Sequence, residues 1–197
     1  MPLGGGTSLA SPTVLEHGSD ELRDRVLRPT LIGEVRWCQL FSEPGAGSDL
    51  AGLATSAVLD GDEWVVNGQK VWTTSAHHAD LAMLLARTDH GVPKHDGLSY
   101  FVLPMHQAGV EVRPIRQMNR HSSFNEVFLT DARVPAAGGA RGSGDRSSAG
   151  EGRQPGPGRG SGDRPAASQA WRYLFAAARA RLISSLESRS ARAWRLS

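Results

Sequence analysis

The chain has 197 residues, enough for one domain with appendages, because domains usually contain about 100–200 residues. Its net charge of +2 is unevenly divided, since residues 1–135 sum to −5 and residues 136–197 to +7. A single cysteine, Cys38, excludes an internal disulfide and predicts a reducing, cytoplasmic location. The longest apolar run, Leu81–Ala86, is too short to span a membrane, and we expect no signal peptide.

The first predicted element is a helix that begins after Ser19. Residues 1–18 begin Gly-rich and indicate no element of their own. Ser19 is a suitable N-cap, two acidic residues follow it, and Leu22 and Val26 recur on one face. Pro29 should end this helix or shortly precede its end. The sequence thus predicts one amphipathic helix without a partner helix nearby in the chain.

From about Arg36 to Pro135 the pattern changes to short apolar segments separated by turn residues. Asp60-Gly61 and Asn67-Gly68 predict hairpin turns, because type I′ turns need residues that tolerate positive φ. This spacing predicts an antiparallel sandwich or barrel of about 100 residues. The expected strands are Ala54–Leu59, Glu63–Val66, Lys70–Thr74, Leu81–Arg87, Leu98–Leu103, Val110–Ile115 and Asn125–Thr130.

The composition changes again at Ala136. Residues 136–168 contain no aliphatic residue larger than alanine and no aromatic one, and ten of the 33 are glycine, so disorder is predicted. Residues 169–197 regain apolar residues between arginines and could form a basic amphipathic helix on a suitable surface. The arginines could attract nucleic acid or an acidic membrane by charge alone, but residues 136–168 lack interleaved aromatics. We therefore predict neither nucleic acid nor membrane as a partner.

The densest motif is Gln39–Asp49. Its glycines allow a sharp turn and a close approach to a ligand, and Ser42 and Ser48 offer hydroxyls to a phosphate or a flavin ring. The motif is not a Rossmann fingerprint, because Leu50 stands where a third glycine is needed, and no Gly-Lys-Ser/Thr follows as in a P-loop. By spacing alone it is compatible with a plain turn between strands.

A metal site is the other candidate that the sequence offers, at His77, His78 and Asp80. Adjacent histidines do not easily share one face, and no third ligand is evident. We therefore expect a solvated turn there and no metal.

Several blocks read together resemble the middle domain of acyl-CoA dehydrogenases. They are Phe41–Asp49, Asp60–Thr74, Leu84–Arg87, Gly97–Pro104 and Phe124–Pro135. Residues 1–35 look like the last helices of that family's N-terminal α-domain, so the resemblance covers about residues 8–137. It implies a mainly β fold, with a middle β-barrel or sandwich domain (36–135) and an N-terminal α-helical remnant (1–35). The composition adds a disordered segment (136–168) and the possible basic helix (169–197).

The resemblance also implies FAD as cofactor and an acyl-CoA thioester as substrate. Ser48 would additionally bind near the CoA or phosphate end of the substrate. The family usually has an aromatic residue where Gln39 stands. The residues expected to bind the cofactor are Gln39, Leu40, Phe41, Ser42, Gly47, Ser48, Trp72, Thr73 and Thr74.

The implied reaction is α,β-dehydrogenation with hydride transfer to the flavin, by an oxidoreductase that passes electrons to an electron-transfer flavoprotein or a similar acceptor. The family is usually homotetrameric. Its general base is a glutamate in a C-terminal helical domain, and no matching motif follows Ala137, so we assign no catalytic residue. A reading-frame shift in GC-rich DNA would explain the change of composition, and we expect a truncated or frameshifted form with little activity alone. A non-catalytic flavin-domain fragment and a basic-tail interaction protein remain open alternatives.

Overall fold

The structure is a computed structural model, and it describes residues 4–136 and 139–140. Contacts within the chain separate a compact unit of residues 1–142 from a second unit of residues 143–197, of which none is described. The predicted disorder beyond residue 140 and the predicted basic helix at 169–197 therefore lie outside the described residues. Among the described residues no helix is long and apolar enough to cross a membrane.

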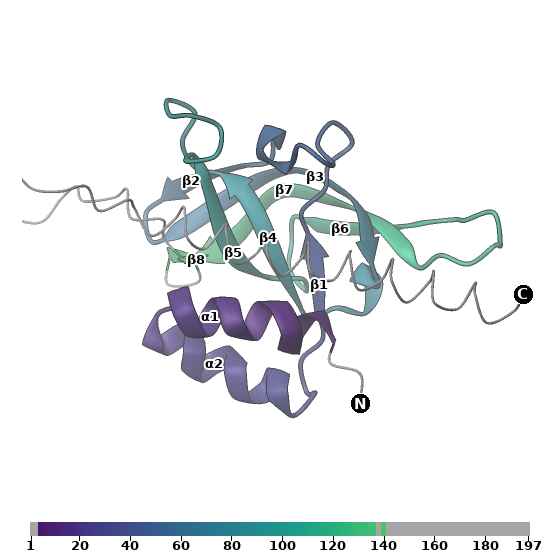
Figure 1. The fold of residues 1–197 in the computed structure, drawn as a ribbon, viewed down its shortest axis with the longest axis horizontal. Coiled ribbons are helices and arrows are strands. Elements are labelled where there is room, and N and C mark those ends of the chain that lie inside the picture. The colour runs from purple at the N-terminus through teal and green to yellow at the C-terminus, as the bar shows by residue number, and fades with distance from the viewer. Residues whose placement is uncertain (1–3, 137–138, 141–197) are drawn as a thin grey trace, which may run out of the picture. The chain divides into compact units, whose positions relative to one another are not determined.

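The N-terminal segment forms three helical elements: η1 (Gly6–Ala10, a π-helix turn), α1 (Ser11–His17) and α2 (Asp20–Leu31). The predicted cap is confirmed, because the Leu22 amide donates to Ser19 Oγ at 3.1 Å. Pro29 lies two residues before the end of α2. The expectation of one unpartnered helix is wrong, since α1 packs against α2 (Figure 1). Val14 of α1 and Leu22 and Val26 of α2 are buried, and the Gly-rich start of residues 1–18 did not indicate these N-terminal helical elements.

The rest of the described chain is one curled sheet, which confirms the mainly β fold (Figure 1). The strands are β1 (Trp37–Leu40), β2 (Ser56–Asp60), β3 (Glu63–Thr74), β4 (Leu81–Arg87), β5 (Leu98–Pro104), β6 (Val110–Ile115), β7 (Phe124–Pro135) and β8 (Gly139–Ala140). Their order in the sheet is β6-β7-β3-β2-β4-β5-β8, and β1 pairs with β4 outside this path. The sheet is not wholly antiparallel as predicted, because β4 pairs in parallel with β1 and, at one position, with β2.

One of the two predicted turns is correct. Asp60 pairs with Glu63 across a tight turn in which Gly61 has φ 65°. The turn predicted at Asn67-Gly68 is wrong, because β3 continues through it with a bulge against β7. A Cβ at Gly68 would lie 2.8 Å from Thr55 Cα, so the glycine is needed for close packing rather than for a turn.

The core lies inside the curl of the sheet. Trp64 packs edge-on against Phe101 with ring centroids 5.4 Å apart. Strand β8 falls in the segment predicted to be disordered from Ala136, and its backbone pairs with β5. The buried core includes Leu40, Val66, Leu84, Phe101, Leu103, Val127, Leu129 and Val134.

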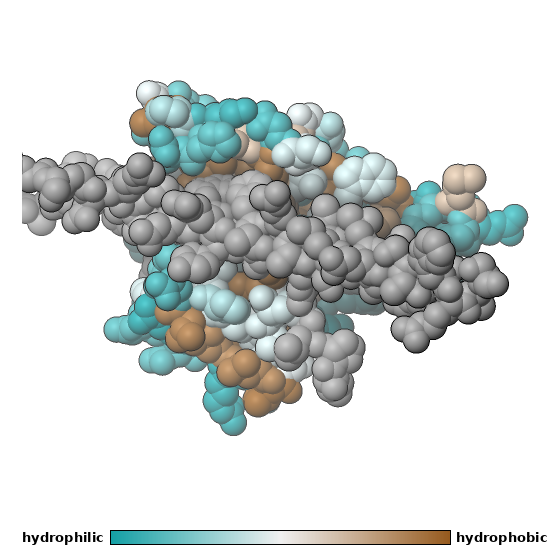
Figure 2. Space-filling view, viewed as in Figure 1, coloured by the Kyte–Doolittle hydropathy of each residue, from teal (hydrophilic) through white to brown (hydrophobic). Residues whose placement is uncertain are grey.

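Some large apolar side chains remain at the surface. Leu15, Leu31 and Ile32 are exposed on or just after the helices, and Figure 2 shows hydrophobic residues over that helical segment. Trp72, at the C-terminal end of β3, is 62% exposed. Single exposed apolar residues are common, but an exposed tryptophan is informative when it borders a cavity.

Candidate functional site

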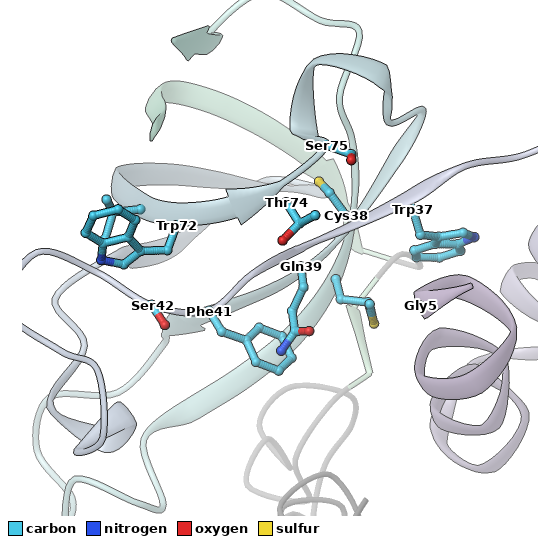
Figure 3. A pocket seen from close by; sticks show the side chains of 11 residues that line it. Gly5, Trp37, Cys38, Gln39, Phe41, Ser42, Trp72, Thr74 and Ser75 are labelled. Atoms are coloured by element: carbon cyan, nitrogen blue, oxygen red, sulfur yellow. The ribbon is translucent and has the colours of Figure 1, made fainter. Parts of the chain in front are cut away.

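An open cavity of about 370 Å³ lies where β1 and its following segment meet the end of β3. Figure 3 shows Trp72 at one end of this cavity and Trp37 at the other. Its size falls in the range of small-ligand pockets, about 300–1,000 Å³. The lining residues are Gly5, Trp37, Cys38, Gln39, Phe41, Ser42, Val71, Trp72, Thr74, Ser75 and Met83.

The cavity contains part of the predicted cofactor site. Leu40 and Thr73 are buried in the protein, and neither lines the cavity. Gly47 and Ser48 are exposed in the turn that follows, and they do not line the cavity. The predicted residues that do line it are Gln39, Phe41, Ser42, Trp72 and Thr74.

Trp72 is exposed because its backbone is left-handed, with φ 61°. The register between β3 and β7 shifts between Lys70 and Thr73, and this bulge directs the indole outward. The indole meets Phe124 edge-on, with centroids 6.2 Å apart and planes at 86°. Left-handed backbone costs a residue with a Cβ about 1–2 kcal/mol, and such strain is concentrated at functional sites. Ser75, at the same cavity, also has positive φ, at 55°.

A buried ion pair that we did not predict from the sequence lies beneath the cavity wall. Lys70 Nζ contacts Glu43 Oε1 at 2.8 Å and donates to the Phe41 carbonyl at 3.1 Å. The Glu43 carboxylate also accepts from the amides of Ala54 at 2.7 Å and Thr55 at 2.9 Å. The side chains are 0% and 7% exposed for Lys70 and Glu43. The pair thus hydrogen-bonds to the backbone of Phe41, which lines the cavity, and to the backbone of Ala54 and Thr55, which does not.

Both partners of this pair have shifted pKa values. Burial lowers the pKa of Lys70 to about 8, against the opposing effect of the Glu43 charge. Burial alone would raise the pKa of Glu43, but the charge and hydrogen bond of Lys70, with those from Thr55 and Ala54, outweigh it. The pKa of Glu43 is therefore lowered, and the two side chains form an ion pair at neutral pH.

The cavity lining itself is neutral. None of the eleven lining residues carries a carboxylate or an amine. Cys38 is the one titratable residue among them, and burial raises the pKa of its thiol to about 12. The thiol therefore stays protonated at physiological pH and is not a nucleophile. These residues can bind and orient a flat, uncharged ring through aromatic walls, hydroxyls and an amide, but they hold no group that could abstract a proton.

The three candidate metal ligands do not converge, although the rings of His77 and His78 lie with centroids 4.0 Å apart. His77 Nδ1 lies 3.0 Å from Asn125 Oδ1. Asp80 instead accepts from the Arg36 amide at 2.8 Å and lies 3.4 Å from His106 Nε2. Within residues 4–136 and 139–140, no group of three or more His, Cys, Asp or Glu side chains could hold a metal ion.

The fold and this cavity define a mainly β domain with an open, aromatic-walled pocket at the ends of two strands. Residues 38–132 match the family model "Acyl-CoA dehydrogenase, middle domain". Residues 38–132 are therefore a middle domain of the acyl-CoA dehydrogenase family.

Individual relatives agree. Acyl-CoA dehydrogenase FadE34 of Mycobacterium tuberculosis is 53% identical over 126 residues, which are 64% of this chain and 18% of that protein. Acyl-CoA dehydrogenase IpdE1 of the same organism is 49% identical over 143 residues, 72% of this chain and 37% of the relative. A glutaryl-CoA dehydrogenase from Mycobacterium smegmatis, solved in complex with FADH2, superposes with a TM-score of 0.59 at 32% identity, over 68% of this chain and 33% of its own.

The matches also set a limit. The chain spans less than two fifths of the length of each of these three relatives. The family is therefore assigned over the matched residues, and the activity of a whole dehydrogenase is a proposal for this chain.

Proposed function

We propose that the cavity binds the isoalloxazine ring of FAD, and that the domain serves the α,β-dehydrogenation of an acyl-CoA thioester. The observation that carries this proposal is the convergence of Gln39, Phe41, Ser42, Trp72 and Thr74 on one neutral cavity. These residues come from two strand ends more than 25 positions apart. If Gln39–Asp49 were only a turn between strands, these side chains would have no reason to line one cavity.

The residues present fit a flavin ring. Such a ring is flat and largely apolar, with a hydrogen-bonding edge, and the cavity offers aromatic walls in Phe41 and Trp72 with hydroxyls in Ser42 and Thr74. The amide of Gln39, which stands where the family usually has an aromatic residue, can both donate and accept. FAD, when bound, supplies the acceptor for a hydride.

The chain's own residues would hold and shield this ring. Ser42 and Thr74 would donate to its polar edge, where negative charge grows on reduction. The indole of Trp72 would exclude water from the ring face. Ser48 lies outside the cavity, which suits the predicted contact with the CoA end of a substrate rather than with the ring. An electron-transfer flavoprotein as acceptor, a homotetrameric assembly and a cytoplasmic location remain predictions.

Flavin binding is tested by titrating the full chain with FAD and following the quenching of flavin fluorescence. We expect saturable binding that weakens about tenfold in Trp72→Ala, which loses an aromatic wall, and about two- to tenfold in Ser42→Ala, which loses a hydroxyl. Val58→Ala is the matched control, because Val58 is 64% exposed on β2 and does not line the cavity. Failure of the wild-type chain to bind FAD, or equal weakening in the control, would contradict the proposal.

Turnover by this chain alone is a separate question. A dehydrogenase must remove an α-proton, and no residue that lines the cavity carries a carboxylate to do so. We therefore expect that the FAD-loaded chain, mixed anaerobically with acyl-CoA, does not bleach the flavin absorbance near the visible maximum. Bleaching would show that the chain supplies its own base; its absence favours a flavin-binding domain without turnover.

A further inference from the structure

We propose that the buried Lys70–Glu43 pair is a positioning device for the cavity, which fixes the Phe41–Ser42 segment against the end of β3 so that Trp72 stays outward. This inference deepens the proposed function, because it names the residues that shape the flavin-facing wall without touching a ligand. Neither side chain lines the cavity.

The contacts join the two walls directly. Lys70, on β3, donates to the carbonyl of Phe41 at 3.1 Å, and one residue further the Val71 amide donates to the Ser42 carbonyl at 2.9 Å. Phe41, Ser42, Val71 and the adjacent Trp72 all line the cavity. Two consecutive residues of β3 thus hold two consecutive residues of the opposite cavity wall.

The carboxylate fixes the same segment from its other side. Glu43 follows Ser42 in the chain, and its two oxygens accept from the amides of Ala54 and Thr55 as well as from Lys70. The segment is therefore tied both to β3 and to the residues that lead into β2. A buried pair with this many backbone partners specifies one arrangement of the chain, even where it adds little net stability.

Trp72 explains why such a constraint is needed. Its left-handed backbone is unfavourable, and it persists only where the surrounding structure determines it. On one side Lys70 and Val71 hold the strand, and on the other Asn125 Nδ2 donates to the Thr73 carbonyl at 2.9 Å. Release of the Lys70 contact would let the bulge relax and the indole leave the cavity edge.

A second lysine provides a matched control within the same chain. Lys94 also contacts a carboxylate at 2.8 Å, that of Asp49, but its side chain is 51% exposed. Lys94 does not line the cavity. A lysine-to-methionine change at position 94 therefore removes the same charge and a contact of the same length, without a buried positioning role.

The test compares Lys70→Met, the double variant Lys70→Met/Glu43→Gln, and Lys94→Met, all in the full chain. Lys70→Met leaves a buried carboxylate unpaired and should be clearly less stable to urea than wild type. The double variant leaves no buried unpaired charge and should regain most of that stability. In the double variant we still expect faster amide hydrogen exchange at Val71 and Trp72, and FAD affinity about tenfold weaker than wild type, because the Phe41 carbonyl has lost its donor.

The readouts separate the possible failures. A double variant with wild-type amide exchange and wild-type FAD affinity would overturn the positioning role and leave the pair as a stability feature only. Wild-type stability of Lys70→Met would also overturn it. If wild type itself binds no FAD, the proposed function fails, and the exchange at Val71 and Trp72 alone decides the positioning role. Lys94→Met should match wild type in every measurement.

Discussion

The backbone conformation of Trp72 leads to a prediction in which the usual order of glycine and alanine is reversed. In a strand of ordinary geometry alanine is more stable than glycine by about 0.5–1 kcal/mol. At φ 61° alanine pays about 1–2 kcal/mol for the left-handed backbone, whereas glycine pays almost none. Both substitutions remove the same indole contacts, so these cancel in the comparison. Trp72→Gly should therefore be more stable than Trp72→Ala by about 0.5–1 kcal/mol.

Urea unfolding of the FAD-free full chain, followed by circular dichroism at 25 °C, measures this difference. Val58, which is as exposed as Trp72 and lies on β2 without positive φ, provides the control pair. Val58→Ala should be more stable than Val58→Gly, so the two positions should differ by about 1–2 kcal/mol in their glycine–alanine order. Alanine equal to or more stable than glycine at position 72 would refute the claim that the cavity stores backbone strain.

Three further predictions concern packing, reactivity and pH. Gly68→Ala should lower the free energy of unfolding by about 1–3 kcal/mol, because the new Cβ would meet Thr55. Gly45→Ala, whose Cβ would have nothing within 4 Å, should change it by less than about 0.5 kcal/mol. Equal effects of the two changes in thermal melts would contradict the packing argument. Cys38 should not react with a thiol reagent at pH 8 until the protein unfolds in urea, because burial raises its thiol pKa to about 12; rapid labelling of the native chain would disprove this. The folded-state pKa of Glu43 lies below its ordinary value of 4.5. The stabilisation of the fold by the Glu43 carboxylate is therefore present above pH 4.5 and is lost as pH falls through the folded-state pKa. Glu43→Gln should flatten this part of the stability–pH profile, and an unchanged slope would contradict the prediction.

Features that depend on a few neighbouring residues could be predicted from the sequence. The Ser19 cap and the Asp60-Gly61 turn each follow from local chemistry, and both are present. Asn67-Gly68 carries the same local signal, but this glycine is required by close packing against Thr55, 13 positions earlier. Local signals cannot distinguish a glycine that makes a turn from one that admits a neighbouring chain.

The candidate site shows the same division. Nine cofactor-binding residues were predicted from the family resemblance, and five of them lie together along the cavity. The burial of Lys70 could not be predicted, because lysine is expected at the surface. In addition, the two bulges in β3 interrupt the alternation of inward- and outward-facing side chains from which its side would be read. Its partner Glu43 lies in a Gly/Pro-rich turn, where a carboxylate is ordinarily solvated. A pair whose members are 27 positions apart leaves no local trace.

The parallel pairing of β1 with β4 has a consequence for the order of events in folding. Trp37 pairs with Leu81, 44 positions away, and the cavity walls come together only when β1, β3 and β4 are all in place. Contacts so distant in sequence form late, since the loops between them must close first. A ligand of this cavity would therefore meet a surface that exists only in the nearly complete fold. It should lengthen the lifetime of the native state by slowing unfolding, while leaving the rate of folding almost unchanged.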